Sequence, residues 1–470
     1  MMKSRFGLIG LGVMGRNFLL NVADHGFPVS GLDIQADKIA SLREEAAGRP
    51  VFATSILSEF IDSLEKPRTI MMLVPAGKPV DSVLQELLPH LEKGDLVIDG
   101  GNSFFEDTNR RYAEVQAHGI HFLGTGVSGG SEGARFGPSI MPGGDKDAYE
   151  VVRPVFEAVA AKVNNDPCVA YMGSSSAGHY VKTVHNGIEY GMMQLIAEVY
   201  DVLRKGLEYQ APQLHELFAK WNQGKLQSFL IEITADIFTQ KDEAGPGWLV
   251  DQILDKAKQK GTGKWTSQSA MDLGIPIPTI DVSVTMRALS ALKNERESAA
   301  EKLPVFQAPA PHYDAAFLVK QLEEALHFAF IVTYGQGLAL LSAASEAFQY
   351  DLHLPDIARI WRGGCIIRSA LLEPIREAYA ENPRLPNLLL APKLKQDILK
   401  GQAAAREVLA FAMRKGIPTA ALGTALAYFD AYRSAKLPTN LTQAQRDYFG
   451  SHTYERVDQQ GIFHTDWASR

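Results

Sequence analysis

The sequence predicts an α/β domain at the N-terminus, a large all-α domain after it, and a C-terminal tail. Short apolar runs alternate with helical patterns over residues 1–130, whereas helix-period patterns dominate from about residue 176. The last stretch is polar with scattered aromatic residues. The chain has 470 residues, too many for one hydrophobic core, so two or three domains are expected.

Strands and helices alternate in the N-terminal part. Apolar runs that end in turn residues predict strands at 5–10, 28–33, 69–74 and 95–101. Strand, helix and strand in this order, with short connections, predict a parallel sheet with helices on both faces. A further unit, "DAYEVVRPVFEAVAAKV" followed by "CVAYMG", extends this domain. The expected boundaries are 1–175, 176–436 and 437–470.

Long helical patterns follow. A helix capped by Ser174 to Ser176 is expected to run unbroken to about Lys205. The stretches "VSVTMRALSALKNERESAAEKL" and "AAFLVKQLEEALHFAFIVTYGQGLALLSAASEAF" are apolar on more than one side and predict core helices. The aromatic residues of the tail suggest that it docks on another surface.

Charge and cysteine content exclude some classes of function. The net charge of −7 argues against a general nucleic-acid-binding protein, because there is no basic excess to neutralise phosphates. Cys168 and Cys365 lie far apart, and neither they nor the histidines show metal-ligand spacing. There is no signal-peptide pattern, and no apolar run approaches the roughly 20 residues of a membrane span. We expect a cytoplasmic protein without metal, nucleic acid or membrane partners.

A glycine pattern near the N-terminus predicts a dinucleotide site. The stretch "GLIGLGVMG" places Gly10, Gly12 and Gly15 between a predicted strand and a predicted helix. In such a pattern the first glycine makes a tight turn, the second admits the pyrophosphate, and the third lets the helix pack on the sheet. The helix N-terminus offers N–H groups to the phosphates. The alternative is a glycine-rich turn that merely closes the sheet.

Asp33 ends the second predicted strand, where the adenosine ribose of a dinucleotide lies. A carboxylate there accepts hydrogen bonds from both ribose hydroxyls of NAD and repels the 2′-phosphate of NADP. Ile34 and Gln35 bring no positive charge, and Lys38 is expected on the following helix. Asp33 therefore indicates NAD, with a role as a turn or N-cap residue as the alternative.

The stretch "HYVKTVHNGIEYG" predicts a chemical site on a helix. Lys182, His185, Asn186 and Glu189 follow at i, i+3, i+4 and i+7, so all four share one face. Lys182 and Glu189 are two turns apart, roughly 10 Å along the axis, which is enough to bracket a small substrate. A solvated polar face with ordinary ion pairs is an equally good interpretation of this pattern alone.

Three loops could contribute polar groups. "GGNS" (100–103) and "GVSGG" (126–130) each follow a strand, and ligands bind at the carboxyl ends of strands in open parallel sheets. Asn102 and Ser128 there offer neutral hydrogen bonds, although turns also favour these residue types. The basic loop "QKGTGKWT" (259–266) could bind phosphate but lacks the spacing of a nucleoside-triphosphate site.

These motifs do not stand alone. The most informative stretches are "GLIGLGVMG", "IDGGNSFFEDTNRR", "GVSGGSEGARFGPSIMPGG", "GHYVKTVHNGIEYG", "QKGTGKWT", "WRGGCIIRS" and "NLTQAQRDYFGSHTYER". Together they resemble the 6-phosphogluconate dehydrogenase family, over nearly the whole chain. The glycine pattern is shared with other β-hydroxyacid dehydrogenases, whereas the C-terminal stretch is much more specific. The resemblance implies a Rossmann-like first domain, a helical second domain that binds substrate and dimerises, and a tail that docks on the partner subunit.

The resemblance also implies a reaction. Lys182 matches the general base that takes the 3-hydroxyl proton of 6-phosphogluconate while hydride passes from C3 to the nicotinamide. The β-keto acid then loses CO₂, and protonated Lys182 stabilises the enolate without a metal. Glu189 matches the acid that protonates C1 to give ribulose 5-phosphate. A lysine base at neutral pH requires a lowered pKa.

The remaining site residues are implied by the same resemblance. The substrate residues are Asn102, Ser128, Gly129, Gly130, His185, Asn186, Tyr190, Lys260, Thr262, Arg287, Arg446 and His452. Of these, Arg446 and His452 would come from the partner's tail in a homodimer. The cofactor residues are Gly10, Gly12, Val13, Met14, Gly15, Asp33, Ile34, Val74 on the adenosine side, and Asn102 beside the nicotinamide.

One departure from the family concerns the coenzyme. NADP-dependent members have Asn-Arg-Thr or Asn-Arg-Ser where this chain has Asp33, Ile34 and Gln35, so the arginine that would meet the 2′-phosphate is missing. We therefore expect NAD to be preferred, with NADP use as the alternative. Two other classes are a non-decarboxylating β-hydroxyacid dehydrogenase, which would not need the basic loop and the tail, and a catalytically silent dinucleotide sensor, which would not need Lys182 and Glu189.

Overall fold

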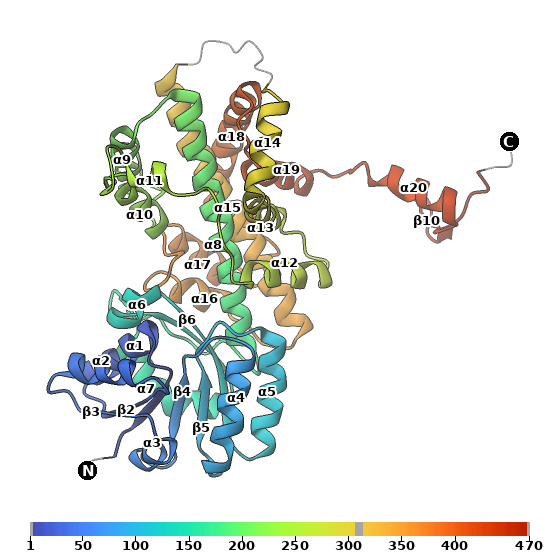
Figure 1. Ribbon diagram of the computed structural model, residues 1–470. Helices are drawn as coiled ribbons and strands as arrows, with labels where there is room; N and C mark the ends of the chain where they lie inside the picture. Colours follow the sequence, from blue (N-terminus) through green and yellow to red (C-terminus); the bar gives the residue numbers. More distant parts are fainter. Residues whose placement is uncertain (1–2, 306–313, 468–470) are drawn as a thin grey trace.

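The structure is a computed structural model that describes residues 3–305 and 314–467. An α/β domain lies at one end, a helical domain packs on it, and the C-terminal tail extends away to one side (Figure 1). This arrangement agrees with the predicted fold class.

The first domain contains a seven-stranded sheet with the order β3-β2-β1-β4-β5-β6-β7. Its strands are β1 (Phe6–Ile9), β2 (Val29–Leu32), β3 (Val51–Thr54), β4 (Thr69–Met72), β5 (Leu96–Asp99), β6 (His121–Ser128) and β7 (Ser139–Gly144). All neighbouring strands are parallel except β6 and β7, which are antiparallel. The strands that the sequence predicts are all parallel to their neighbours. Strand β7 was not predicted, and it runs antiparallel because residues 129–138 are fewer than the dozen or so that a parallel crossover needs.

Helices cover both faces of the sheet, as the strand and helix order predicts. They are α1 (Val13–Asp24), α2 (Ala36–Ala46), α3 (Leu57–Ser63), α4 (Lys78–Leu87) with a 3₁₀ turn (Leu88–His90), α5 (Phe105–Ala117), α6 (Gly130–Phe136) and α7 (Lys146–Val159). Leu8 packs in a core with α1, α2 and α7, whereas Ile9 packs in a second core with α3, α4 and α5. Successive side chains of β1 thus point to opposite faces of the sheet, and both Leu8 and Ile9 are buried.

The end of the first domain is less regular than its pattern predicts. A small hairpin, β8 (Lys162–Val163) and β9 (Asp166–Pro167), follows α7. "CVAYMG" then runs beside β7 through isolated bridges at Val169 and Gly173 and forms no full strand.

The second domain is helical. Its helices are α8 (Ala177–Asp201), α9 (Ala211–Trp221), α10 (Phe229–Ile237), α11 (Leu249–Gln252), α12 (Thr262–Asp272), α13 (Pro278–Ala291), α14 (Lys293–Lys302), α15 (Ala315–Ala347), α16 (Leu354–Ile360), α17 (Leu372–Glu381), α18 (Lys395–Lys415) and α19 (Ala420–Tyr432), with 3₁₀ turns at Leu388–Leu390 and Pro392–Leu394. Helices α8 and α15 run through its centre (Figure 1).

Two expectations about these helices need correction. Helix α8 ends at Asp201 and continues as a π-helical turn, Val202–Gly206, and Ser176 at its N-cap makes no side-chain capping bond. The stretch predicted as one core helix is two helices that break at Leu292. The second of them, α14, buries no residue, because it consists mainly of charged residues and alanine.

Helix α15 is the long core helix that the sequence predicts. Among the described residues it is the one helix long and apolar enough to cross a membrane, in contrast to the expectation that no apolar run approaches that length. However, 78% of its most apolar window is buried within the protein. Its packing against α8, α18 and α19 explains this composition.

Helix α8 lies directly against the sheet, and glycines permit this contact. A Cβ at Gly178 of α8 would meet the carbonyl oxygens of Met141 and Gly124, and a Cβ at Gly126 would meet the side chain of Lys182. The lysine is therefore placed beside the carboxyl end of β6, where ligands of open α/β sheets bind.

The tail forms a small unit of its own. It contains α20 (Thr439–Gly450) and the hairpin β10 (Tyr454–Glu455) and β11 (Ile462–Phe463). The Asp447 carboxylate is fully buried at its centre and accepts hydrogen bonds from Thr453 N, His464 Nδ1, Thr465 N and Trp467 Nε1 at 2.8–3.0 Å. A folded tail that leaves its own body suggests a contact elsewhere.

Candidate active site

The glycine turn has the geometry that the sequence predicts. Gly10 has φ +97°, and a Cβ there would lie 2.6 Å from the carbonyl oxygen of Leu73. Gly12 is the N-cap of α1 and has open space at its Cβ position, while a Cβ at Gly15 would clash with the Gly10 carbonyl. Exposed backbone at the N-terminus of α1 suits a pyrophosphate. The residues present therefore fit a bound dinucleotide.

Asp33 does two things in this turn. Its carboxylate is buried, and it accepts hydrogen bonds from Leu11 N at 2.7 Å and Gln35 N at 2.9 Å. Lys38 Nζ on α2 lies 3.6 Å from Asp33 Oδ2. A carboxylate has about four lone-pair sites, so acceptors remain for ribose hydroxyls. The interpretation of Asp33 as a turn residue is confirmed by these two bonds, whereas the N-cap of α2 is Gln35. The contact of Asp33 with the ribose stays a prediction.

Other predicted cofactor residues line the same edge of the sheet. Val74 follows β4, and its Cγ1 lies 3.0 Å from the Cβ position of Gly10. Val13 and Ile34 are exposed, at 58% and 92%. Met14 packs partly against the core.

The polar stripe of α8 is buried, so the interpretation as a solvated face is wrong. Lys182 is 6%, His185 0% and Asn186 8% exposed. His185 links the stripe: its Nδ1 lies 3.4 Å from Lys182 Nζ, 3.2 Å from Asn186 Oδ1 and 3.9 Å from Glu189 Oε2. Its Nε2 lies 3.2 Å from Ser128 Oγ at the end of β6.

Burial shifts the protonation of these groups. Loss of solvation lowers the pKa of Lys182, which the charge of Glu189 opposes. Burial likewise raises the pKa of Glu189, which Lys182 and Arg287 oppose. The pKa of His185 is held well below its ordinary value by burial and by Lys182, so the imidazole is neutral. A base and an acid with pKa values moved toward neutrality are what proton transfer at neutral pH requires.

Basic groups lie around Tyr190, the residue that follows Glu189 on α8. The Arg287 guanidinium stacks over the Tyr190 ring at 3.4 Å. Thr262 begins α12, whose N-cap is Gly261 with φ +102°, and Gly263 packs against Tyr190. Lys260 is exposed just before this helix start. A helix N-terminus, a guanidinium and a lysine together suit a phosphate, as the loop "QKGTGKWT" suggested.

The two predicted loops reach the same region. Gly129 has φ +121°, and a Cβ there would lie 2.6 Å from the carbonyl oxygen of Gly364 in the helical domain. Gly130 opens α6, and exposed Asn102 follows β5. The structure thus brings together groups from β5, β6, α8, α12 and α13.

Arg446 and His452 do not join this site within the chain. Both are exposed, and they belong to the tail, which Figure 1 shows well away from α8. Their action on a partner subunit stays a prediction.

The sequence did not reveal the residues that pack behind the polar stripe of α8. The Trp361 ring contacts His185 edge-to-face at 5.5 Å, and Cys365 is close enough to influence the charge of Lys182. Both are fully buried. Burial raises the pKa of Cys365 to about 12, so its thiol stays neutral. The stretch "WRGGCIIRS" was noticed, but nothing in its pattern shows that it packs on α8. The described residues contain no cluster that could hold a metal ion.

Comparisons with known proteins agree with this geometry. The model of the NAD binding domain of 6-phosphogluconate dehydrogenase matches residues 5–173, and that of the C-terminal domain of the same enzyme matches residues 178–467. The chain belongs to the 6-phosphogluconate dehydrogenase family. Members of this family match the chain over nearly its full length and over their own. It is 53% identical to a Bacillus subtilis protein named as an NADP(+)-dependent, decarboxylating 6-phosphogluconate dehydrogenase, over 99% of this chain and 100% of that one.

Further members of the 6-phosphogluconate dehydrogenase family are similarly close. The chain is 51% identical to a decarboxylating 6-phosphogluconate dehydrogenase of Escherichia coli, over 99% of this chain and 100% of that one. The solved 6-phosphogluconate dehydrogenase of Plasmodium falciparum superimposes with a TM-score of 0.96 at 43% identity, covering 98% and 100% of the two chains. That structure was described free, with NADP+ and with 6-phosphogluconate.

Proposed function

We propose that this chain catalyses the oxidative decarboxylation of 6-phosphogluconate to ribulose 5-phosphate and CO₂, with NAD preferred over NADP. The observation that supports the reaction is the pairing, on one face of α8, of buried Lys182 with Glu189, whose side chain is only 20% exposed. His185 links the two, and the basic groups around Tyr190 follow. A cytoplasmic location is part of the proposal, and the free, buried state of both cysteines is compatible with it.

The groups of the site divide the chemistry among them. Neutral Lys182 removes the proton of the 3-hydroxyl, and bound NAD supplies the acceptor for the hydride from C3. The 3-keto acid releases CO₂ as the electrons of the C1–C2 bond move toward the carbonyl, and protonated Lys182 stabilises the negative oxygen. Glu189 gives a proton to the resulting carbanion carbon. The basic groups around Tyr190 bind the phosphate, which orients the sugar along α8.

Initial-rate kinetics on 6-phosphogluconate with NAD and NADP test this proposal, together with measurement of released CO₂. A non-decarboxylating β-hydroxyacid dehydrogenase would form a keto product without CO₂, which would contradict the proposed activity. Equal rates with NAD and NADP would contradict only the coenzyme preference.

NAD preference rests on the adenosine end of the site. The Asp33 carboxylate stands at the end of β2, and the exposed side chain beside it is Ile34, which gives a 2′-phosphate no positive partner. The Lys38 ammonium, on the following helix, is paired with Asp33 at 3.6 Å. The Bacillus subtilis relative is named for NADP(+), so the preference is proposed from this chain's own residues.

The shifted groups predict a narrow pH profile. The active state of the Lys182 and Glu189 pair holds one proton, so activity falls when a second proton binds and when the last one leaves. Burial moves the pKa of Glu189 up from 4.5 and that of Lys182 down from 10.5, so both limbs of the profile move inward. In Glu189→Gln, activity should be much lower and should rise with pH through the Lys182 pKa without an alkaline fall. A retained alkaline limb would contradict this assignment.

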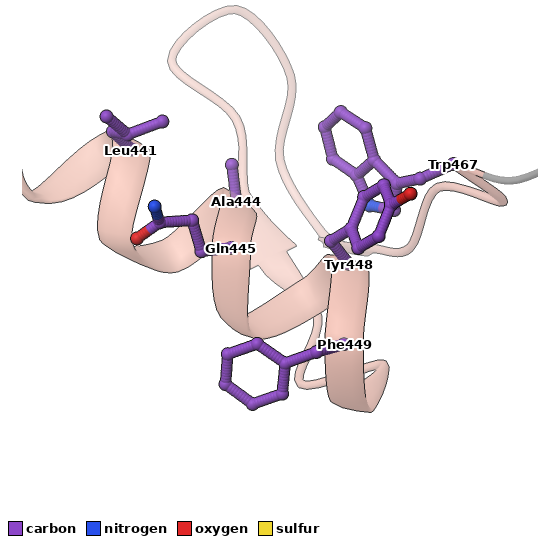
Figure 2. Close-up of a pocket in the computed structure, with 6 residues that line it drawn as sticks. All are labelled: Leu441, Ala444, Gln445, Tyr448, Phe449 and Trp467. Atoms are coloured by element: carbon purple, nitrogen blue, oxygen red, sulfur yellow. The ribbon is translucent and has the colours of Figure 1, made fainter.

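A homodimer with composite sites is also part of the proposal. One face of the tail is an apolar groove of about 500 Å³. It is lined by Leu441, Ala444, Gln445, Tyr448, Phe449 and Trp467 (Figure 2). Phe449 is 73% exposed, and the tail lies away from its own body in Figure 1. A second copy of the chain is the occupant that would bring Arg446 and His452 to an active site.

Mixed dimers test the composite site. We expect Lys182→Met and Arg446→Met homodimers to be inactive or nearly so, while a purified mixed dimer should regain about half of wild-type activity. One of its sites has an intact Lys182 and receives Arg446 from the other subunit. If Arg446 acted within its own chain, neither site would be complete, and the mixed dimer would be no more active than its parents.

A further inference from the structure

A buried arginine outside the catalytic stripe holds the loop that bears Asn102. Arg111 on α5 is fully buried. Its Nε donates to Asp81 Oδ1 at 2.7 Å, and its Nη2 donates to the Gly77 carbonyl at 3.0 Å. Both acceptors belong to the start of α4, so two nitrogens of the guanidinium are fixed to one helix.

The third nitrogen faces the neighbouring loop. Arg111 Nη1 lies 3.4 Å from Ser103 Oγ and 3.5 Å from Asp99 Oδ2. Ser103 donates to Asp99 Oδ2 at 2.6 Å, and Gly101 N donates to Asp99 Oδ1 at 3.0 Å. Asp99 and Ser103 are themselves buried, while Asn102 between these bonds is exposed. The network therefore fixes the backbone on both sides of Asn102 and leaves its side chain free for a ligand.

Helix α5 is also joined to the catalytic helix. Thr108 Oγ1 lies 2.7 Å from His179 Nδ1, and both residues are buried. Thr108 stands three residues before Arg111 on α5, and His179 three residues before Lys182 on α8. Helix α5 is thus bonded both to the loop that bears Asn102, through Arg111, and to the helix that bears Lys182, through Thr108.

We propose that Arg111 is a positioning residue that, through Asp99 and Ser103, sets the place of Asn102 relative to Lys182 and the nicotinamide end of the dinucleotide. This inference rests on the proposed function and on the contacts with substrate and nicotinamide that the family resemblance implies for Asn102. A planar guanidinium suits the task because it reaches four groups at fixed angles, which a lysine ammonium does not.

Arg111→Met is the principal test, with Arg110→Met as the matched control. Arg110 is the next residue and also bonds Asp81, at 2.9 Å, but its side chain is 51% exposed and it does not reach the loop. We expect Arg111→Met to lower kcat about 100-fold, since an error of about 1 Å in position has effects of that size. Arg110→Met should remain within about 2-fold of wild type, as other surface changes do.

Binding supplies a readout that does not depend on turnover. Arg111→Met should weaken NAD binding several-fold in calorimetric titration, with ADP-ribose binding unchanged, because ADP-ribose lacks the nicotinamide. A general loss of structure would weaken both ligands alike and lower Tm in proportion. Equal weakening of both ligands, or a kcat within about 3-fold of wild type, would overturn the proposal.

A double-mutant cycle separates this inference from the proposed function. If Arg111 acts through Asn102, Asn102→Ala/Arg111→Met should be no slower than Asn102→Ala alone, and independent, multiplying effects would overturn the inference. If Arg111→Met does not fold, Arg111→Lys and Ser103→Ala take its place, each combined with Asn102→Ala in the same double-mutant cycle. A wild-type enzyme without activity on 6-phosphogluconate would instead overturn the proposed function, while the ligand titrations would still test the position of the loop.

Discussion

Lys182→Met is expected to lower kcat by about 10⁴-fold while NAD binds as tightly as to the wild type. Lys182 is 6% exposed and lies beside the end of β6, whereas the glycine turn proposed for the pyrophosphate follows β1. Methionine has a similar length but cannot accept a proton. Kinetics and calorimetric NAD titration on the same preparation check both parts of this prediction.

The same substitution should not lower Tm. Burial depresses the pKa of Lys182 in the folded protein, so the unfolded chain binds the proton more tightly. Burying the lysine therefore costs stability at every pH below its ordinary pKa of 10.5, and the cost is largest below its depressed folded pKa. Glu189, whose pKa burial already raises, can take up a proton when its partner is removed. The difference in Tm between variant and wild type should thus shrink as the pH rises toward 10.5.

Lys205→Met is the control for charge removal on the same helical segment. Lys205 follows α8, is 62% exposed and pairs with Asp201 at 2.9 Å. It should leave kcat unchanged and alter Tm little. A Lys182→Met enzyme with more than about one-tenth of wild-type kcat would reject the role of Lys182 as the base.

Adding an arginine at position 34 is expected to redirect the coenzyme. Ile34 is 92% exposed beside Asp33, so Ile34→Arg places a guanidinium there without disturbing the core. A charge-assisted hydrogen bond to the 2′-phosphate is worth about 1.5–3 kcal/mol, so kcat/KM with NADP should rise about 10-fold or more. Val151→Arg, on an exposed site of α7, is the control and should leave kcat/KM unchanged with both NAD and NADP.

Adding Asp33→Asn should enlarge the shift but weaken the turn. Removal of the carboxylate charge relieves its repulsion of the phosphate, so the double variant should change the NADP to NAD ratio by roughly 100- to 1,000-fold. However, both Asp33 oxygens accept backbone N–H groups, and an asparagine amide has one oxygen only. The loss of one bond should cost about 1–3 kcal/mol of stability, seen as a lower Tm in Asp33→Asn and in the double variant but not in Ile34→Arg. An unchanged coenzyme ratio in the double variant would show that discrimination lies elsewhere.

Local patterns were enough to predict much of this protein. Gly10, Gly12 and Gly15 lie between a predicted strand and a predicted helix, with Asp33 at the end of the next strand, and this local context indicates the dinucleotide site. The i, i+3, i+4 and i+7 positions of Lys182, His185, Asn186 and Glu189 share a face in any α-helix. The antiparallel edge strand β7 was harder to predict, because "SIMPGG" lacks the residues typical of strands.

Contacts between distant segments could not be predicted. Arg111 meets Asp81 and Gly77 across about 30 residues of chain, and nothing in "EDTNRRYAE" distinguishes it from Arg110, which is half exposed. Trp361 reaches His185 in the same way from a far part of the chain. The difference between α13 and α14 likewise depends on which helix has neighbours to cover it.

By itself, the sequence determined which groups share a turn or a helix face and, through Asp33 and Ile34, the charge that a coenzyme meets. Only the tertiary structure decided whether those groups are buried. The glycines of β6, β7 and α8 bring Lys182 against the sheet, and Trp361 and Cys365 close the space behind it. Because solvation controls the pKa of a lysine and a glutamate, that burial makes the polar stripe of α8 suitable for proton transfer.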